Sequence, residues 1–173
     1  MCCIFWMLQT FCVVAPMVDP NDFRIYRPNV AAIVRDVEGR ILLGQRTDYP
    51  DSWQFPQGGR DPGESPEDAL PRELREEISL EPGDYRIVTS RGPYRYLFHG
   101  GRRKEGYRGQ EQTYFLLDLL ASPDKISVST PHPEFRSIRW VMPSQVRATW
   151  VPPVKRDVYR QVLRDFFGME IAS

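Results

Sequence analysis

A glycine-rich loop leading into a helix with three clustered glutamates is the feature that most constrains this chain. Ser65 has the side chain of an N-cap residue and Pro66 suits the first helical position, so a helix is predicted from this point. Glu73, Glu76 and Glu77 fall at i, i+3 and i+4 and share one face. Like charges so placed repel by about 0.2–0.5 kcal/mol per pair on an isolated helix. We therefore expect a cation against this face. Mg²⁺ or Mn²⁺ fits, because such ions prefer oxygen ligands and often complete their shell with substrate phosphate.

The residues around the glutamates favour a metal site over an ordinary solvated helix face. A run such as RELREE is by itself typical of a solvated face with ion pairs. However, five residues separate Gly58 from Glu64, and seven separate Glu64 from Arg72. Gly58, Gly59 and Gly63 allow a tight loop in which Glu64 folds back toward the helix. Arg72 is then placed to neutralise part of the cluster and to orient one carboxylate.

Residues 58–80 resemble the Nudix box, whose pattern is G-x5-E-x7-R-E-U-x-E-E-x-G-U, with U a bulky aliphatic residue. One specified position differs, because Ser79 stands where the pattern has glycine. That glycine normally serves as a left-handed residue after the helix, so serine is expected to cost some strain. Pro71 falls inside the helix and removes its backbone bond to Glu67, which we expect to kink or loosen the first turns.

The resemblance extends from about Arg24 to Gly168 and is to the bacterial RNA pyrophosphohydrolase branch of the Nudix family. That branch also includes dinucleoside polyphosphate hydrolases of plants and proteobacteria. Besides the rest of the box, the matching stretches are Tyr26–Val30, Trp53–Gly59 (which runs into the box), Gly109–Gln112, Phe115–Leu117, Pro133–Phe135, Trp140–Val141 and Lys155–Arg160.

The predicted elements belong to the α/β class. Strands are predicted at 30–34, 40–43, 85–89, 94–98, 112–119 and 137–141, and an amphipathic helix at 154–167. Strands flanked by two main helices give an α/β sandwich. The resemblance implies a Nudix-type α/β/α sandwich with a mixed sheet between the helices. We expect residues 19–173 to form a single Nudix hydrolase domain.

Residues 1–18 form an apolar extension without Lys or Arg. They lack the basic region of a secretory signal. We interpret this extension as the product of an upstream start codon, with Met17 as the true beginning, and a membrane anchor is the minority alternative. A cytoplasmic location without a stable membrane partner is accordingly expected.

The resemblance implies hydrolysis of a phosphoanhydride, in which divalent ions neutralise developing charge and activate a water. Glu73, Glu76 and Glu77 are then the metal ligands, and Arg72 is part of the catalytic set. Glu134 matches the additional acidic residue that this branch supplies from a distant loop. Its role as a further metal ligand or as the general base stays open.

Substrate-binding residues are expected outside the box. Arg27 and Arg46 are expected to bind substrate phosphates, and Gln110 to position a phosphate or a base. Lys155 and Arg156 begin the last predicted helix, where the helix dipole normally favours acidic residues. These two cations indicate either an anionic partner or solvent-exposed charge.

The segment 91–109 mixes basic residues with tyrosines and glycines. The basic cluster Arg102–Lys104 is expected to reach phosphates, and Tyr94 or Tyr96 to stack a base. The alternative is a solvated hairpin tip. Because the matching region of the family borders the substrate cleft, the resemblance favours a role in substrate binding.

Three functions follow from these observations. The 23 basic and 23 acidic residues cancel, so phosphate binding must come from local clusters, and no DNA partner is expected. The leading hypothesis is an RNA 5′-pyrophosphohydrolase, which takes pyrophosphate or phosphate off 5′-phosphorylated RNA. The second is a dinucleoside polyphosphate hydrolase. The third, a non-catalytic Nudix-fold binding module, is disfavoured because such a module has no physical reason to keep clustered carboxylates.

Overall fold

The computed structural model describes residues 25–49 and 51–171, so the predictions for residues 1–18 lie outside the described part of the chain. The strands of this part are β1 (Tyr26–Arg35), β2 (Ile41–Arg46), β3 (Trp53–Gln54), β4 (Gln57–Gly59), β5 (Tyr85–Leu97), β6 (Gly109–Leu119) and β7 (Phe135–Val141). Its α-helices are α1 (Pro66–Ile78) and α2 (Arg156–Phe167). None of the described helices combines the length and apolar character needed to cross a bilayer.

The strands form one mixed sheet in the order β3-β2-β1-β6-β5, with β4 paired to β1 and β7 paired to β2. Strands β1 and β6 run parallel, and the other pairs are antiparallel. The two strands predicted at 85–89 and 94–98 are one strand, β5. Register shifts between Ile87 and Thr89 and between Arg91 and Tyr94 interrupt its alternation, which explains why the sequence suggested a break.

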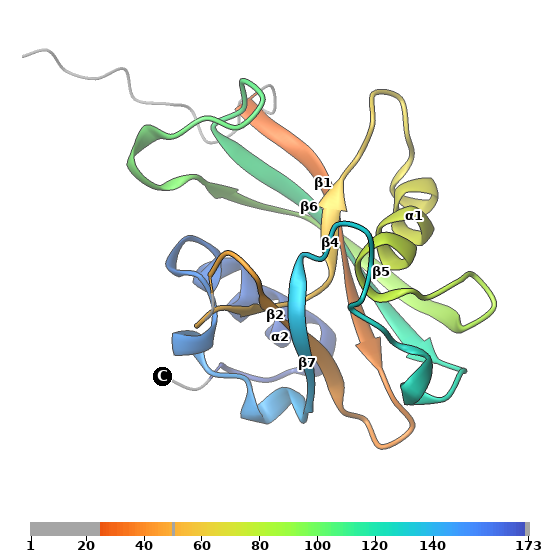
Figure 1. The fold of residues 1–173 in the computed structure, drawn as a ribbon. Coiled ribbons are helices and arrows are strands. Elements are labelled where there is room, and N and C mark those ends of the chain that lie inside the picture. The colour runs from red at the N-terminus through yellow and green to blue at the C-terminus, as the bar shows by residue number, and fades with distance from the viewer. Residues whose placement is uncertain (1–24, 50, 172–173) are drawn as a thin grey trace, which may run out of the picture.

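The two helices cover opposite faces of the sheet (Figure 1). Residues Val30–Val34 of β1 are all buried, because successive side chains of this central strand enter the two cores in turn. The core on one face is lined by the α1 residues Ala69, Leu70, Leu74 and Ile78. The core on the other face is lined by the α2 residues Val158, Tyr159, Val162 and Leu163. The predicted α/β/α sandwich with a mixed sheet is confirmed.

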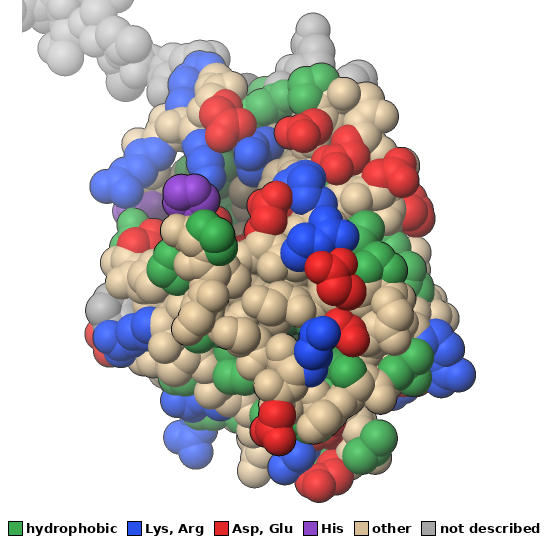
Figure 2. All heavy atoms as spheres, turned by 45° about the vertical axis from the view of Figure 1, so that its right-hand side comes forward, with side chains coloured by type: hydrophobic (Ala, Val, Ile, Leu, Met, Phe, Trp, Pro, Cys, Tyr) green, Lys and Arg blue, Asp and Glu red, His purple; other side chains and the backbone are tan. Residues whose placement is uncertain are grey.

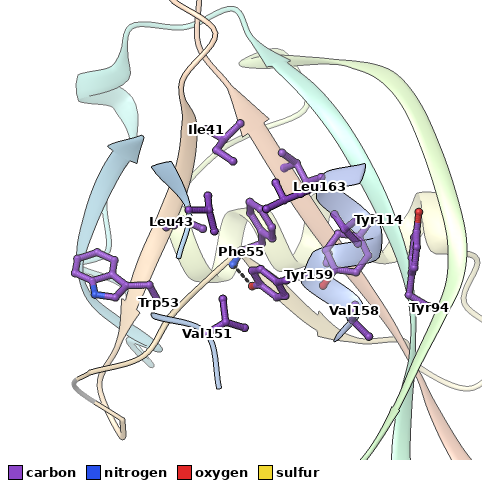
Figure 3. Close-up of a cluster of buried hydrophobic side chains, with 14 of the residues drawn as sticks. Ile41, Leu43, Trp53, Phe55, Tyr94, Tyr114, Val151, Val158, Tyr159 and Leu163 are labelled. Atoms are coloured by element: carbon purple, nitrogen blue, oxygen red, sulfur yellow. Dashed lines mark hydrogen bonds between the residues drawn. The ribbon is translucent and has the colours of Figure 1, made fainter. Parts of the chain in front are cut away.

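An aromatic stack connects α2 to the segment before β4 (Figure 3). The rings of Phe55 and Tyr159 lie 5.0 Å apart at 14°, and the Phe55 N–H donates to the Tyr159 hydroxyl at 2.8 Å. Both side chains are fully buried. The position of β4, which carries the box glycines, is thereby fixed against the C-terminal helix.

Helix α1 begins after the predicted N-cap Ser65 and ends before Ser79, the residue that replaces the glycine of the box. The Ser65 Oγ accepts from the Asp68 N–H at 3.1 Å, which confirms the predicted cap. The helix continues without interruption through Pro71, so the expected loosening does not break it. Ser79 adopts the left-handed conformation, with φ 60° and ψ 25°. Its hydroxyl donates to the Ser127 carbonyl at 3.2 Å, a bond that glycine could not form and that offsets part of the strain.

Candidate functional site

The two glycines of β4 provide space for charged side chains. A Cβ at Gly58 would collide with the carboxylate of Glu73, and one at Gly59 with the guanidinium of Arg27. The prediction that Gly58 and Gly59 lie in a tight loop is wrong, because both belong to strand β4. Gly63 does lie in a turn and has a positive φ of 82°. The strand backbone therefore lets an anion and a cation lie directly against it.

Arg72 connects the loop, the strand and the helix. Its Nη2 donates to the Gly59 carbonyl at 2.8 Å and to Glu64 Oε2 at 2.9 Å, and its Nη1 donates to Glu73 Oε1 at 2.7 Å. The hydrogen bond from Arg72 lowers the pKa of Glu64, and the two carboxylates raise the pKa of Arg72. Glu64 thus folds back as predicted, and Arg72 neutralises and orients the carboxylate of Glu73.

Glu77 is the most enclosed of the three helix glutamates. Its Oε2 accepts from the Gln57 N–H at 2.8 Å, while its Oε1 is buried and has no hydrogen-bond partner among the described residues. Burial raises the pKa of Glu77 well above its ordinary value, and the negative charges of Glu134 and Glu73 raise it further. In its ionised form, a buried carboxylate with an unpartnered oxygen requires a counter-charge, and without one it takes up a proton. The residues present therefore fit a divalent cation.

The loop that carries Glu134 is tied to the end of β2. The backbone carbonyl of Glu134 accepts from the Thr47 N–H at 3.0 Å and from the Thr47 hydroxyl at 3.2 Å. The carboxylate is about half exposed and lies 4.0 Å from Arg46 Nη1. Its charge also contributes to the raised pKa of Glu73, for which burial is the main cause. The structure thus brings this distant residue toward the helix glutamates, as the sequence predicted.

The carboxylates do not converge on one point in this conformation. Within residues 25–49 and 51–171, no three acidic, histidine or cysteine side chains form a group that could hold a metal ion as they stand. Arg72 Nη1 lies 2.7 Å from Glu73 and 3.7 Å from Glu76, which is exposed. A metal ion bound by both would require this guanidinium to shift.

Both arginines predicted to bind phosphate hold carboxylates instead. Arg46 donates to the two oxygens of Asp48 at 2.6 Å each. Arg27 donates through Nε to Glu105 at 2.8 Å. A guanidinium binds carboxylate and phosphate with the same fork of donors, so these contacts mark two anion-binding positions beside the glutamates.

Lys155 is buried, with 6% of its surface exposed, so the interpretation as solvent-exposed charge is wrong for this residue. Its Nζ donates to Gln54 Oε1 at 2.9 Å and lies 5.7 Å from the centre of the Tyr96 ring. Burial and then the nearby Arg46 lower the pKa of Lys155 to about 7. Arg156 is partly buried and donates to the Val151 carbonyl at 3.4 Å.

The tyrosines of β5 do not offer a stacking surface. Tyr94 and Tyr96 are more than nine-tenths buried, which contradicts the prediction that one of them stacks a base. The Tyr94 hydroxyl donates to Asp165 at 2.7 Å, and the Tyr96 hydroxyl donates to Gln110. Tyr96 and Gln110 are thus joined through a hydroxyl and an amide, a contact that the sequence did not predict. The basic cluster Arg102–Lys104 is exposed at the hairpin between β5 and β6.

A buried amide network, which the sequence did not suggest, supports the site. Gln112 Nε2 donates to Asn29 Oδ1 at 2.7 Å and to Gln57 Oε1 at 2.9 Å. These side chains join β6, β1 and β4 next to the N–H that binds Glu77. Gln54, Asp48 and Glu105 were missed as well. Neither Gln112 nor Gln57 had a clear signal in the sequence, because β6 also carries Gln110, Glu111 and Thr113, and β4 consists of Gln57 and two glycines. Nothing near Glu105 in the sequence points to Arg27.

Comparison with known proteins agrees with this geometry. Residues 25–162 match the NUDIX domain family. The chain is 39% identical over 160 residues to an RNA pyrophosphohydrolase of Pseudomonas putida, covering 86% of this chain and 94% of the relative. It is 41% identical over 161 residues to an RNA pyrophosphohydrolase of Photorhabdus laumondii, covering 87% and 86%.

Solved structures share the fold at lower identity. The dihydroneopterin triphosphate pyrophosphohydrolase of E. coli aligns with a TM-score of 0.60 and 20% identity, over 82% of this chain and 97% of that protein. An Ap4A hydrolase of C. elegans, in a binary complex, aligns with a TM-score of 0.59 and 20% identity, over 83% and 99%. Nudix hydrolases generally need divalent metal ions. The domain match and the two curated relatives, together with the glutamate site, place this chain in the Nudix family as a Nudix hydrolase.

Proposed function

We propose that this Nudix hydrolase removes pyrophosphate or phosphate from the 5′ end of RNA. The observation that carries the proposal is the enclosed carboxylate of Glu77, which has an unpartnered oxygen. Glu73 and Glu134 are close enough to raise its pKa. The names of the two curated relatives support RNA as the substrate.

The residues suited to hold the ion are Glu73, Glu76, Glu77 and Glu134. A bound Mg²⁺ or Mn²⁺ supplies neutralisation of charge on the phosphates and activation of the attacking water. Glu77 is enclosed whereas Glu134 is half exposed. This difference favours Glu77 as a ligand and Glu134 as the group that accepts the proton of the attacking water. Arg72 restrains Glu73 through its hydrogen bond.

The substrate phosphates are held by Arg27 and Arg46 in this proposal. Each already binds a carboxylate with its guanidinium donors. Lys155 and the pair of Tyr96 and Gln110 border the same region, since the charge of Arg46 acts on the pKa of both Lys155 and Tyr96. These groups are buried, so in this proposal each exchanges its present partner for a hydrogen bond to the first nucleotide. A cytoplasmic location, without a DNA or membrane partner, is part of the proposal.

Hydrolysis of dinucleoside polyphosphates is the second candidate. The burial of Tyr94 and Tyr96 favours it, because it removes the stacking surface expected for further RNA bases. Acidic and basic side chains also lie side by side across the face shown in Figure 2, which offers no extended positive track for a nucleic-acid backbone. The chemistry and the glutamate site are the same for both candidates.

The deciding experiment compares two substrates on one preparation. Turnover of 5′-triphosphorylated RNA and of diadenosine tetraphosphate is measured with Mg²⁺ and with Mn²⁺. We expect a larger kcat/KM for the RNA. A larger kcat/KM for diadenosine tetraphosphate would replace the proposal with the second candidate, and no metal-dependent turnover of either would favour the binding module.

The basic cluster Arg102–Lys104 provides an independent test of substrate choice. Each phosphate contact to a single strand adds about 0.7 to the slope of log affinity against log salt. Neutralising the three residues together should weaken RNA binding and flatten its salt dependence, with little change in diadenosine tetraphosphate hydrolysis. Equal losses on both substrates would assign the cluster to the shared phosphate site, and no loss on either would make it a solvated hairpin tip.

A further inference from the structure

The hairpin between β5 and β6 places the carboxylate of Glu105 against Arg27, a residue of the proposed substrate site. Glu105 Oε2 accepts from Arg27 Nε at 2.8 Å, although the two residues are 78 positions apart. Arg27 is mostly enclosed, with 19% of its side chain exposed, whereas 55% of the Glu105 side chain is exposed. The contact therefore joins a fixed cation of the site to an anion on the solvent side.

The environments of Arg27 and Glu105 suit a contact that another anion can replace. The guanidinium of Arg27 lies against Gly59, whose carbonyl accepts from Arg72, so it stays beside the glutamate site without Glu105. Glu105 has φ 53° and is followed by Gly106 with φ 86°. A left-handed conformation is unfavourable for glutamate. The exposed carboxylate of Glu105 is therefore carried on a tip whose backbone conformation costs energy, and solvent can replace its contact with Arg27.

From this geometry we infer that Glu105 is a specificity-determining residue, which occupies on Arg27 the position that a substrate phosphate takes. The inference rests on the proposed function, because it assumes that Arg27 binds substrate phosphate. Carboxylate and phosphate compete for the same guanidinium donors. A 5′-triphosphate carries more negative charge than the monophosphate left after hydrolysis, so it displaces Glu105 more readily. Return of Glu105 to Arg27 then helps to expel the product.

The test uses Glu105→Gln, which keeps the size of the side chain and removes its charge. For 5′-triphosphorylated RNA we expect KM to fall about 1.5- to 5-fold, the range for a partly exposed ion pair. The inhibition constant of 5′-monophosphorylated RNA should fall by at least as much. The matched control is Glu38→Gln, which removes an exposed glutamate whose partner is Arg40 in a remote turn. Its KM and inhibition constant should not change.

A double variant separates local competition from general electrostatics. In the Arg27→Ala background, Glu105→Gln should change neither KM nor the inhibition constant. If the single change leaves both constants unaltered, or if its effect persists without Arg27, the inference is overturned. Lower thermal stability of Glu105→Gln with unchanged constants would assign the contact a structural role and would also overturn it.

Inorganic pyrophosphate distinguishes failure of this inference from failure of the proposed function. The same variants are titrated calorimetrically with pyrophosphate in the presence of Mg²⁺. Tighter binding by Glu105→Gln, by about 1.5- to 5-fold and only when Arg27 is present, supports the competition even if RNA is not hydrolysed. Equal affinities of the wild type and Glu105→Gln would reject the competition, whatever the substrate.

Discussion

Because the amine of Lys155 is buried, we predict that the wild type and a Lys155→Met variant have stability–pH profiles that cross. The pKa of Lys155 is lowered from 10.5 to about 7, mainly by burial. A base with a lower pKa in the folded state binds fewer protons there than in the unfolded chain, so stability rises with pH between 7 and 10.5 and is lost as pH falls toward 7. At about 1.4 kcal/mol per pKa unit, the full penalty at low pH is about 5 kcal/mol.

The variant is Lys155→Met, which keeps most of the length of the side chain and removes the titrating amine. Between pH 6.5 and 9.5 the wild type should gain about 3 kcal/mol of unfolding free energy relative to the variant. At high pH the variant should be less stable by about 1–3 kcal/mol, because Gln54 loses its partner. At pH 6.5 the order should reverse.

Urea unfolding in EDTA at four pH values provides the measurement. Titrating groups that do not act on Lys155 cancel in the difference, whereas Glu77 and Glu134, whose charges act on its pKa, contribute to it. Parallel profiles, with the same free-energy difference at every pH, would refute the reasoning and would mean that the amine of Lys155 is hydrated.

Three further predictions concern the site and its support. Glu77→Gln should lower metal-dependent turnover by orders of magnitude while circular dichroism shows an intact fold; near-normal rates would reject Glu77 as a metal ligand. Gly58→Ala should also lower turnover, because its Cβ would displace the carboxylate of Glu73, and wild-type kinetics would show that this carboxylate need not lie against the strand. Tyr159→Phe removes the acceptor of the buried Phe55 N–H and should cost about 1–3 kcal/mol of unfolding free energy, measured as a lower urea midpoint; an unchanged midpoint would mean that the N–H finds another partner.

Local patterns were sufficient to predict the framework of this fold. The run at 30–34 predicted a strand, which the structure shows to be buried on both faces. The cap at Ser65 was predicted at the residue where it occurs. The spacing of the box indicated that Glu64 folds back toward the helix, and it does, because Arg72 binds both Glu64 and the Gly59 carbonyl. Each of these features depends on neighbours in sequence or on a motif with fixed spacing.

The features that could not be predicted depend on packing between distant segments. A basic residue at a helix start is usually exposed, but Lys155 is covered because the turn that precedes α2 packs against β5, and its Nζ reaches Gln54 of β3. Tyr94 and Tyr96 looked available because their segment is polar, yet the core on the α2 side encloses their rings. The function of Gly58 as space for Glu73 becomes visible only when strand and helix are placed together.

The parallel pairing of β1 with β6 has a consequence for the rate at which the site forms. Arg27 lies directly opposite Gln110 in this pairing, and the chain must close a loop of about eighty residues to bring them together. Closing so long a loop costs entropy before any contact compensates for it, and folding slows as contacts become less local. Helix α1 can form its turns from local interactions, whereas Arg27, Gln110 and Tyr96, which we propose to bind substrate, come together only after this slow step. A nascent chain therefore forms the helix that carries the proposed metal ligands well before the proposed substrate site is complete.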